Sequence, residues 1–253
     1  IVTGSVTSAQ NIIKCCNQSG LDVEDIVLEP LSSSQAVLSP DEQEVGVVLV
    51  DIGGGTTDVT IYSEGSIVHT SVLALGGNHL THDIAIGLGA PLHEAEEIKH
   101  NFGVAMTSMV KEDEMIEVPS VGGRNNRTMK KRVLASIIED RFREIFELIA
   151  HEIEKTHFHT LMASGVVITG GTCIMPGADQ LASQVLNLPV RVGFPENITG
   201  LREMIYSPKY ATSVGLVRYG ITSNQGKLNF AGDDTNLFHK VSRRMKDWMQ
   251  NFF

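Results

Sequence analysis

A glycine loop between two apolar runs constrains this sequence more than any other feature. Residues 48–62 read VLVDIGGGTTDVTIY. The apolar runs on both sides of the glycines are typical of buried β-strands. Glycine lets another group approach the backbone closely, and the exposed N–H groups of such a loop can hold an anion. The pattern predicts a strand–loop–strand hairpin that binds a nucleotide phosphate. The alternative is a tight hairpin that uses glycine only for its turn geometry.

Polar side chains in and beside the loop suit a phosphate. Thr56 and Thr57 can donate hydrogen bonds from their hydroxyls, and the Asp51 carboxylate can hold a magnesium ion, directly or through water. A P-loop would need a lysine and then a helix, and a dinucleotide-binding fingerprint would also need a helix after the glycines. Because an apolar strand follows this loop, both of these alternatives are excluded.

Two further motifs follow along the chain. In GVVITGGT, residues 165–172, a buried strand again runs into paired glycines, which would let the backbone lie against a base or a ribose. An ordinary strand–turn–helix crossover is the alternative. Glu96 and Lys99 share one face of a helix predicted over 93–100, either as ligand contacts or as a solvated ion pair. The order of the three motifs is more specific than any one of them.

The remaining pattern predicts an α/β chain. We expect helices over 11–19, 32–38, 131–155, 178–186 and 211–219. We expect strands over 26–28, 45–52, 59–62, 66–75, 165–169 and 190–192. Residues 111–130 are interpreted as a short strand and an exposed loop, and residues 223–236 as a polar linker.

Composition limits the classes of function. The chain has 253 residues, enough for two domains or one large α/β domain, and no apolar run approaches the length of a bilayer span. A net charge of −10 argues against nucleic acid as a partner. Cys15, Cys16 and Cys173 show no disulfide framework, as expected in a reducing cytoplasm. The chain opens on Ile1 in what resembles the middle of a fold, so we expect a piece of a longer protein.

The last segment, residues 237–253, differs in charge from the rest. It has four basic residues against Asp247, a local balance of +3, which leaves −13 for the remainder of a chain whose total is −10. At helical spacing the apolar side chains gather on one face, and the last of them lies just beyond it: Leu237, Phe238, Val241, Met245, Trp248, Met249, Phe252 and, just beyond, Phe253. The basic side chains lie opposite or towards the edge: Lys240, Arg243, Arg244 and Lys246. This pattern predicts a helix that lies in the headgroup region of an anionic membrane. The alternative is a helix that packs on its own domain or on a partner.

Taken together, these segments resemble the actin superfamily and, more narrowly, the FtsA family of bacterial division proteins. The resemblance lies in GVVLVDIGGGTTDVTIY, EAEEIKHNFGVA, EVPSVGGR, GVVITGG, LPVRVGFPENITGL and YATSVGLVRYG, in family order. It implies an actin-like ATPase fold, in which a ribonuclease H-like lobe has an inserted subdomain and a C-terminal amphipathic helix follows. The fold is expected to be partial, because the family's first phosphate loop has no counterpart here.

The resemblance also assigns site residues. It implies bound ATP and magnesium, with slow or no hydrolysis and no catalytic base assigned. The residues implied are Asp51, Gly53, Gly54, Gly55, Thr56 and Thr57 in a phosphate loop, Glu96 and Lys99 at the ribose and base, and Gly170, Gly171 and Thr172 in an adenosine loop. Gly76 and Gly77 also match, either near the site or in a turn. The expected divisions are the end of an extra subdomain (1–25), parts of a first lobe (26–44 and 206–222), a second lobe core (45–85 and 161–205), an inserted subdomain (86–160), a linker (223–236) and the membrane helix (237–253).

For partners, the resemblance implies a tether between the membrane and the division protein FtsZ. The C-terminal peptide of FtsZ would bind within 86–160, where Lys130, Lys131 and Arg132 could receive acidic groups or simply start a solvated helix. Self-association into filaments, contacts with other divisome proteins and a place on the inner face of the cell membrane at the division site are also implied. The alternative is another ATPase or kinase of the superfamily whose C-terminal helix packs on a protein partner.

Overall fold

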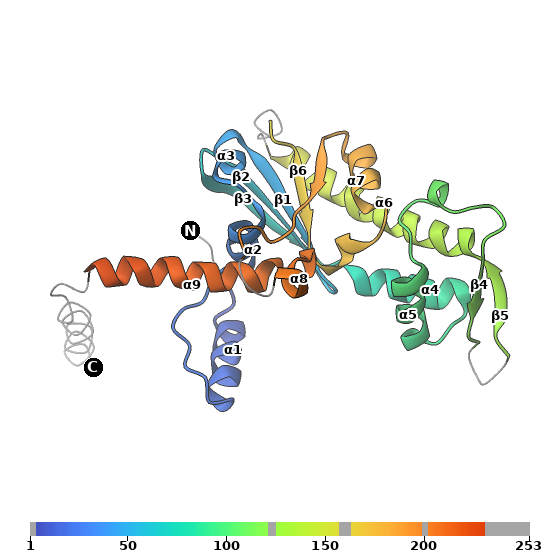
Figure 1. Cartoon of the computed structure of the whole chain (residues 1–253), viewed down its shortest axis with the longest axis horizontal. Helices are drawn as coiled ribbons and strands as arrows, with labels where there is room; N and C mark the ends of the chain where they lie inside the picture. The colour runs from blue at the N-terminus through green and yellow to red at the C-terminus, as the bar shows by residue number, and fades with distance from the viewer. Residues whose placement is uncertain (1–3, 121–124, 157–162, 199–201, 231–253) are drawn as a thin grey trace, which may run out of the picture.

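A mixed β-sheet forms the centre of the protein (Figure 1). The computed structural model describes residues 4–120, 125–156, 163–198 and 202–230. The strands follow the order β3-β2-β1-β6-β7. Their bounds are β1 Val47–Ile52, β2 Thr57–Ser63, β3 Ser66–Leu73, β6 Val166–Thr169 and β7 Val190–Val192. The first three strands form an antiparallel meander, whereas β6 runs parallel to both β1 and β7.

Helices cover both faces of this sheet. On one face lie α6 (Lys131–Lys155) and α7 (Ala178–Leu186), and on the other lie α2 (Glu29–Val37) and α9 (Ala211–Phe230). Helix α4 (Gly77–Leu88) extends beyond the end of the sheet and packs against α6. Successive side chains of a strand point to opposite faces. Val48, Val50 and Ile52 therefore join the core with α4, α6 and α7, while Val47 and Leu49 pack in a smaller core with α2 and α9. The all-buried β1 is thus covered on both sides.

A second group of elements lies beyond one end of the sheet (Figure 1). It contains α5 (Leu92–Phe102) and a hairpin of β4 (Met115–Val118) and β5 (Arg127–Lys130). The long helix α6 links this group to the sheet, because its buried stripe belongs to the large core. Shorter elements complete the chain: α1 Val6–Gln18, α3 Pro40–Val45, α8 Arg202–Ile205, and the 3₁₀ turns η1 Thr107–Met109, η3 Gly171–Ile174 and η4 Pro208–Tyr210.

The structure confirms most of the predicted elements. The helices expected over 131–155 and 178–186 have the predicted bounds, and the meander and the strand before the second glycine pair are present. Apolar side chains three or four residues apart specify α6 because they fall on one side of a helix and are buried there. No helix in the described part of the chain is both long and apolar enough to cross a membrane.

Near the N-terminus one prediction is wrong and another differs in where the helix begins. Residues 26–28 have no regular secondary structure and pair with no strand of the described sheets, so the short apolar run is not a strand. The helix expected over 32–38 begins earlier, at Glu29, with Pro30 in its first turn, where the missing N–H of proline costs nothing. Pro40 does not simply end that helix. It starts α3, which Ser39 caps through a hydrogen bond from the Glu42 N–H.

The predicted linker over 223–236 is also wrong in its first half. The last helix, α9, continues to Phe230, and no proline interrupts 211–230. Helix α4 was not predicted at all, although Leu80, Ile84 and Leu88 repeat every four residues on its buried face. The predicted membrane helix, 237–253, lies outside the described residues.

Candidate functional site

The glycine loop after β1 is held by the first turn of α4. The N–H groups of Gly77 and Asn78 donate hydrogen bonds to the carbonyls of Gly53 and Gly54, at 2.9 and 2.7 Å. In a planar trans peptide, a C=O and the N–H that follows it point in opposite directions. The N–H groups of Gly54 and Gly55 are therefore turned away from α4, and within the described chain neither finds an acceptor. This arrangement makes them available to an anion.

Close packing explains the glycines at the start of α4. A Cβ atom at Gly76 would lie 2.6 Å from the Gly53 carbonyl oxygen, and one at Gly77 would lie 2.6 Å from the Thr172 hydroxyl oxygen. Real Cβ atoms do not approach that closely. The two glycines thus allow α4 to begin directly against the glycine loop after β1.

The second glycine pair meets the first loop from the neighbouring strand. Because β1 and β6 are parallel, their carboxyl ends lie at the same edge of the sheet. Gly170 has φ +93°, and a Cβ atom there would lie 2.5 Å from Asp51 Oδ1. The Thr172 hydroxyl donates a hydrogen bond of 2.9 Å to the Gly53 carbonyl. These contacts join the two loops.

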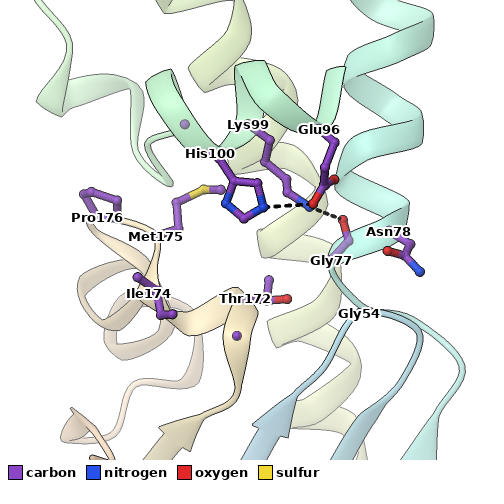
Figure 2. A pocket seen from close by; sticks show the side chains of 12 residues that line it. Gly54, Gly77, Asn78, Glu96, Lys99, His100, Thr172, Ile174, Met175 and Pro176 are labelled. Carbon is purple, nitrogen blue, oxygen red and sulfur yellow. Dashed lines mark hydrogen bonds and ion pairs between the residues drawn. The ribbon is translucent and has the colours of Figure 1, made fainter. Parts of the chain in front are cut away.

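A cavity of about 260 Å³ opens beside the joined loops (Figure 2). Its walls come from the glycine loop after β1, the start of α4, one side of α5 and the η3 segment. The lining residues are Gly54, Gly77, Asn78, Glu96, Lys99, His100, Gly103, Gly171, Thr172, Ile174, Met175 and Pro176. All three sequence motifs therefore reach one cavity, although 119 residues separate Gly53 from Thr172.

Glu96 and Lys99 form a hydrogen-bonded group in the cavity wall. The buried Lys99 ammonium donates to Glu96 Oε2 at 2.7 Å, to the Thr81 hydroxyl at 2.8 Å and to the Gly77 carbonyl at 3.1 Å. Burial alone would raise the pKa of Glu96. The hydrogen bonds from Lys99 and Thr81 and the charge of Lys99 outweigh burial and lower that pKa below its usual value. Glu96 is therefore ionised and fixes the side chains around it.

Asp51 lies behind the loops instead of lining the cavity. Its Oδ2 atom accepts a hydrogen bond of 2.7 Å from Ser33 on α2 and one of 3.4 Å from Thr212 on α9. Burial raises the pKa of Asp51, and these two hydrogen bonds only partly offset that rise. A buried carboxylate without a cationic partner is well suited to a metal ion.

Two further carboxylates, which the sequence analysis missed, surround Asp51. Asp58 is its cross-strand neighbour on β2, and Glu29 is the first residue of α2. Burial, together with the charges of Glu29 and Asp51, raises the pKa of Asp58 to about 6. Burial and the Asp51 charge also raise the pKa of Glu29. The register of the hairpin could have predicted that Asp58 lies beside Asp51. No local sequence pattern indicates that Glu29 lies near them.

The donor chemistry around Asp51 fits magnesium. Mg²⁺ prefers oxygen ligands and keeps several waters, so one or two carboxylates are enough when a phosphate completes the site. Within the described residues, no group of three or more His, Cys, Asp or Glu side chains could enclose a metal ion by itself. Asp51, assisted by Asp58 or Glu29, would hold the ion together with water and phosphate.

The comparison with known families identifies the chain. Residues 48–215 match the family described as Cell division protein FtsA. The chain belongs to this family. FtsA proteins of Pseudomonas aeruginosa and Escherichia coli K12 are 40% and 39% identical to it, over 100% of this chain and 62% of each relative. The FtsA protein of Bacillus subtilis is 39% identical over 87% of the chain. The chain thus spans about three-fifths of the length of the first two relatives.

Solved structures of distantly related sequence share the fold of this chain. MreB5 of Spiroplasma citri bound to ADP has a TM-score of 0.72 at 19% identity, over 89% of this chain and 68% of that one. PilM, in the PilM–PilN type IV pilus biogenesis complex, has a TM-score of 0.64 at 17% identity, over 84% and 57%. The predicted actin-like ATPase fold is confirmed.

Only some of the site residues expected for this FtsA-family chain line the cavity. Gly54, Glu96, Lys99, Gly171 and Thr172 line the cavity, as expected of ligand contacts. The others lie around it. Gly53 and Gly170 lie in the layer behind it, whereas Gly55 and Thr56 are exposed on the loop. Thr57 is different, because its buried hydroxyl donates to the Leu75 carbonyl at 2.8 Å and is not free for a phosphate.

Proposed function

We propose that this chain carries the nucleotide site and the membrane and partner surfaces of an FtsA-type division protein. The convergence of three separate motifs on one cavity is the observation that carries the nucleotide assignment. A phosphate chain would lie on the free N–H groups of Gly54 and Gly55. The ribose and base would extend between α5 and the η3 segment. MreB5, which shares the fold, is described as bound to ADP and to AMPPNP in two structures, and that likeness supports the same ligand class.

Magnesium would accompany the nucleotide. A bound Mg²⁺ would neutralise charge on the phosphate oxygens. Asp51 would hold the ion from behind the loop, and the Ser33 and Thr212 hydroxyls would keep its carboxylate oriented. Because the charge of Asp51 raises the pKa of Glu29, and the charges of Glu29 and Asp51 raise that of Asp58, a cation among them would relieve this repulsion.

A titration with a fluorescent ATP analogue and magnesium tests the nucleotide site. Gly54→Val and Gly171→Val place a branched side chain in the cavity, so each should weaken binding at least tenfold. A Cβ atom meets nothing closer than 3.5 Å at Gly54 and 3.7 Å at Gly171, so the fold should tolerate both changes. Gly220→Val on α9, where nothing lies within 4 Å, is the matched control. Equal affinity in all three variants would refute the site.

The group of elements beyond the sheet offers a surface for an acidic peptide such as the FtsZ C-terminal tail. A hollow of about 520 Å³ lies beside the start of α6. Its lining residues are Thr107, Lys130, Arg132, Val133, Ser136 and Ile137. Val133 is 42% exposed, which adds an apolar contact to two cations. Lys131 does not contribute, because its ammonium pairs with Glu114 at 2.8 Å. Apolar contact beside unpaired cations is suited to an amphipathic acidic segment.

Membrane attachment and assembly complete the proposal. The amphipathic pattern of 237–253, with its excess of basic charge, supports a peripheral position on an anionic inner membrane surface at the division site. Family membership supports self-association into filaments and contacts with further divisome proteins. In this reading the chain ties the FtsZ polymer to the membrane and uses ATP to control its own assembly.

A further inference from the structure

The α5 wall of the cavity contains a histidine to which the sequence motifs assign no role. His100 lies at the cavity mouth, one residue after Lys99, and Figure 2 shows its ring between Glu96 and the Met175 side of the cavity. Its side chain is 71% exposed, so the ring is accessible to a ligand. Ile174, Met175 and Pro176 form an apolar wall across from α5. A flat heteroaromatic base suits such a slot, with one face on the apolar wall and its edge towards α5.

The neighbours of His100 on α5 are already fully engaged. Lys99 uses its three N–H donors on Gly77, Thr81 and Glu96. Glu96 uses Oε2 for Lys99 and Thr81, and Oε1 for His100. Among the ionisable side chains that line the cavity, only His100 therefore retains an uncommitted hydrogen-bonding atom, its Nδ1. The base edge should meet that atom.

Glu96 determines whether Nδ1 of His100 accepts or donates a hydrogen bond. The His100 Nε2 atom lies 3.0 Å from Glu96 Oε1. An ionised carboxylate only accepts hydrogen bonds, so Nε2 must carry the proton. In the neutral imidazole the other nitrogen is then an acceptor. Lys99 and Thr81 hold Glu96 in place, so this tautomer is fixed before any ligand arrives.

We propose that His100 is the residue that selects a 6-amino purine at this site. Its Nδ1 accepts a hydrogen bond from the exocyclic amino group of adenine, and it opposes the 6-oxo group of hypoxanthine or guanine, since two acceptors would face each other. This inference rests on the proposed nucleotide site and adds the means by which that site recognises the base. The effect is a difference between bases and not a general gain in affinity.

Binding of MgATP and MgITP to the unaltered chain and to single variants tests the proposal. ITP differs from ATP by a 6-oxo group in place of the amino group, so the phosphate and ribose contacts are shared. We expect ATP to bind at least fivefold more tightly than ITP, about the factor contributed by one hydrogen bond. His100→Phe should remove that preference by weakening ATP and leaving ITP within about twofold. His100→Lys, which offers only donors, should favour ITP.

A second histidine on the same helix provides the matched control. His93 is 76% exposed, pairs with Glu94 and does not line the cavity. His93→Phe should leave the ratio of the two dissociation constants unchanged. If His100→Phe weakens ATP and ITP equally, His100 acts only through Glu96 and the proposal is wrong. If ATP binds and the preference survives in His100→Phe, the base is read elsewhere. If neither nucleotide binds the unaltered chain, the proposed function fails as well.

Discussion

The Thr172 hydroxyl donates a hydrogen bond of 2.9 Å to the carbonyl of Gly53 and thereby joins the two glycine loops. The same carbonyl accepts the Gly77 N–H, so three segments meet at one oxygen atom. That oxygen atom points away from the side on which the Gly54 N–H is free. The contact therefore orients the phosphate loop and one wall of the cavity together.

Replacing Thr172 with valine should loosen this junction. The change keeps the volume and the β-branch of the side chain but removes the hydroxyl, so the free energy of unfolding should fall by about 1 kcal/mol. Nucleotide affinity should fall by about fivefold, because the loop loses one of the contacts that orient it. Scanning calorimetry measures the change in stability, and titration calorimetry measures the change in nucleotide affinity. Thr172→Ser should restore them; a serine variant as weak as the valine variant would contradict this role.

Gly170 should tolerate no side chain. In Gly170→Ala the Cβ atom would lie 2.5 Å from both Asp51 Oδ1 and the Ile52 carbonyl oxygen, at φ +93°. Strain at positive φ and overpacking together should lower the free energy of unfolding by about 3 kcal/mol or more. Thermal melts compare this variant with Gly171→Ala, whose Cβ atom would meet only Lys209 Cβ at 3.7 Å. Equal melting temperatures for the two variants would show that the close approach is not real.

The carboxylates around Asp51 should make stability depend on pH. The pKa of Asp58 rises from 3.8 to about 6 on folding, so the native state holds its proton longer than the unfolded state. The contribution of Asp58 to the free energy of unfolding is therefore complete below pH 3.8 and is lost as the pH rises through about 6. Above that pH, Asp58→Asn should stabilise the protein.

The size of this effect is limited by exposure. In a fully buried group, a pKa shift of this size would change the free energy of unfolding by roughly 3 kcal/mol. Asp58 is half-exposed, so solvent screening reduces the expected change to about 1 kcal/mol. Denaturant unfolding of the unaltered chain and of Asp58→Asn, from acid to neutral pH, measures the difference in their free energies of unfolding. The difference should vanish in acid, where Asp58 is protonated in both states. Asp113→Asn, at an exposed turn, is the control. A destabilised Asp58→Asn variant at neutral pH would refute the account.

Charge reversal beside α6 tests the partner surface. Lys130→Glu with Arg132→Glu should weaken binding of an FtsZ C-terminal peptide at least tenfold, since both cations line the hollow there. Fluorescence anisotropy of a labelled peptide measures the loss. Arg143→Glu, further along α6, removes an exposed pair with Glu139 and should leave binding intact. Binding that is insensitive to the double change would place the peptide elsewhere.

The C-terminal segment should bind anionic lipid. Removal of 237–253 should release the protein from anionic liposomes, and Trp248→Glu should do nearly the same by placing a charge on the apolar face. Each basic residue near the surface contributes on the order of 1 kcal/mol, so binding should weaken with salt. Trp248 is the only tryptophan, so a blue shift on lipid addition reports its immersion. Gln10→Glu on the exposed α1 changes the net charge by the same amount as Trp248→Glu and is the control. A truncated chain that still floats would disprove the anchor.

The sequence by itself determined the local elements and the family. Period-two and period-3.6 patterns are local, so the meander, α6 and α7 could be predicted from neighbouring residues alone. The glycine motifs were also visible, because their φ angles and close contacts allow few other residues. The same reasoning failed for 26–28, where an apolar run had no sheet partner, and for 223–230, where polar composition did not prevent a helix.

Only the tertiary structure decided which side of the loops each group faces. Asp51 and Thr57 belong to the phosphate motif, yet strand alternation and register turn Asp51 towards Ser33 and Thr212 and commit the Thr57 hydroxyl to Leu75. Glu29 reaches Asp51 because α2 packs across β1, and His100 gains an accepting Nδ1 because Glu96 is held by Lys99. Such relationships depend on packing between segments far apart in the chain. A sequence pattern shows which residue types are present, but it does not show which way their side chains face in the folded chain.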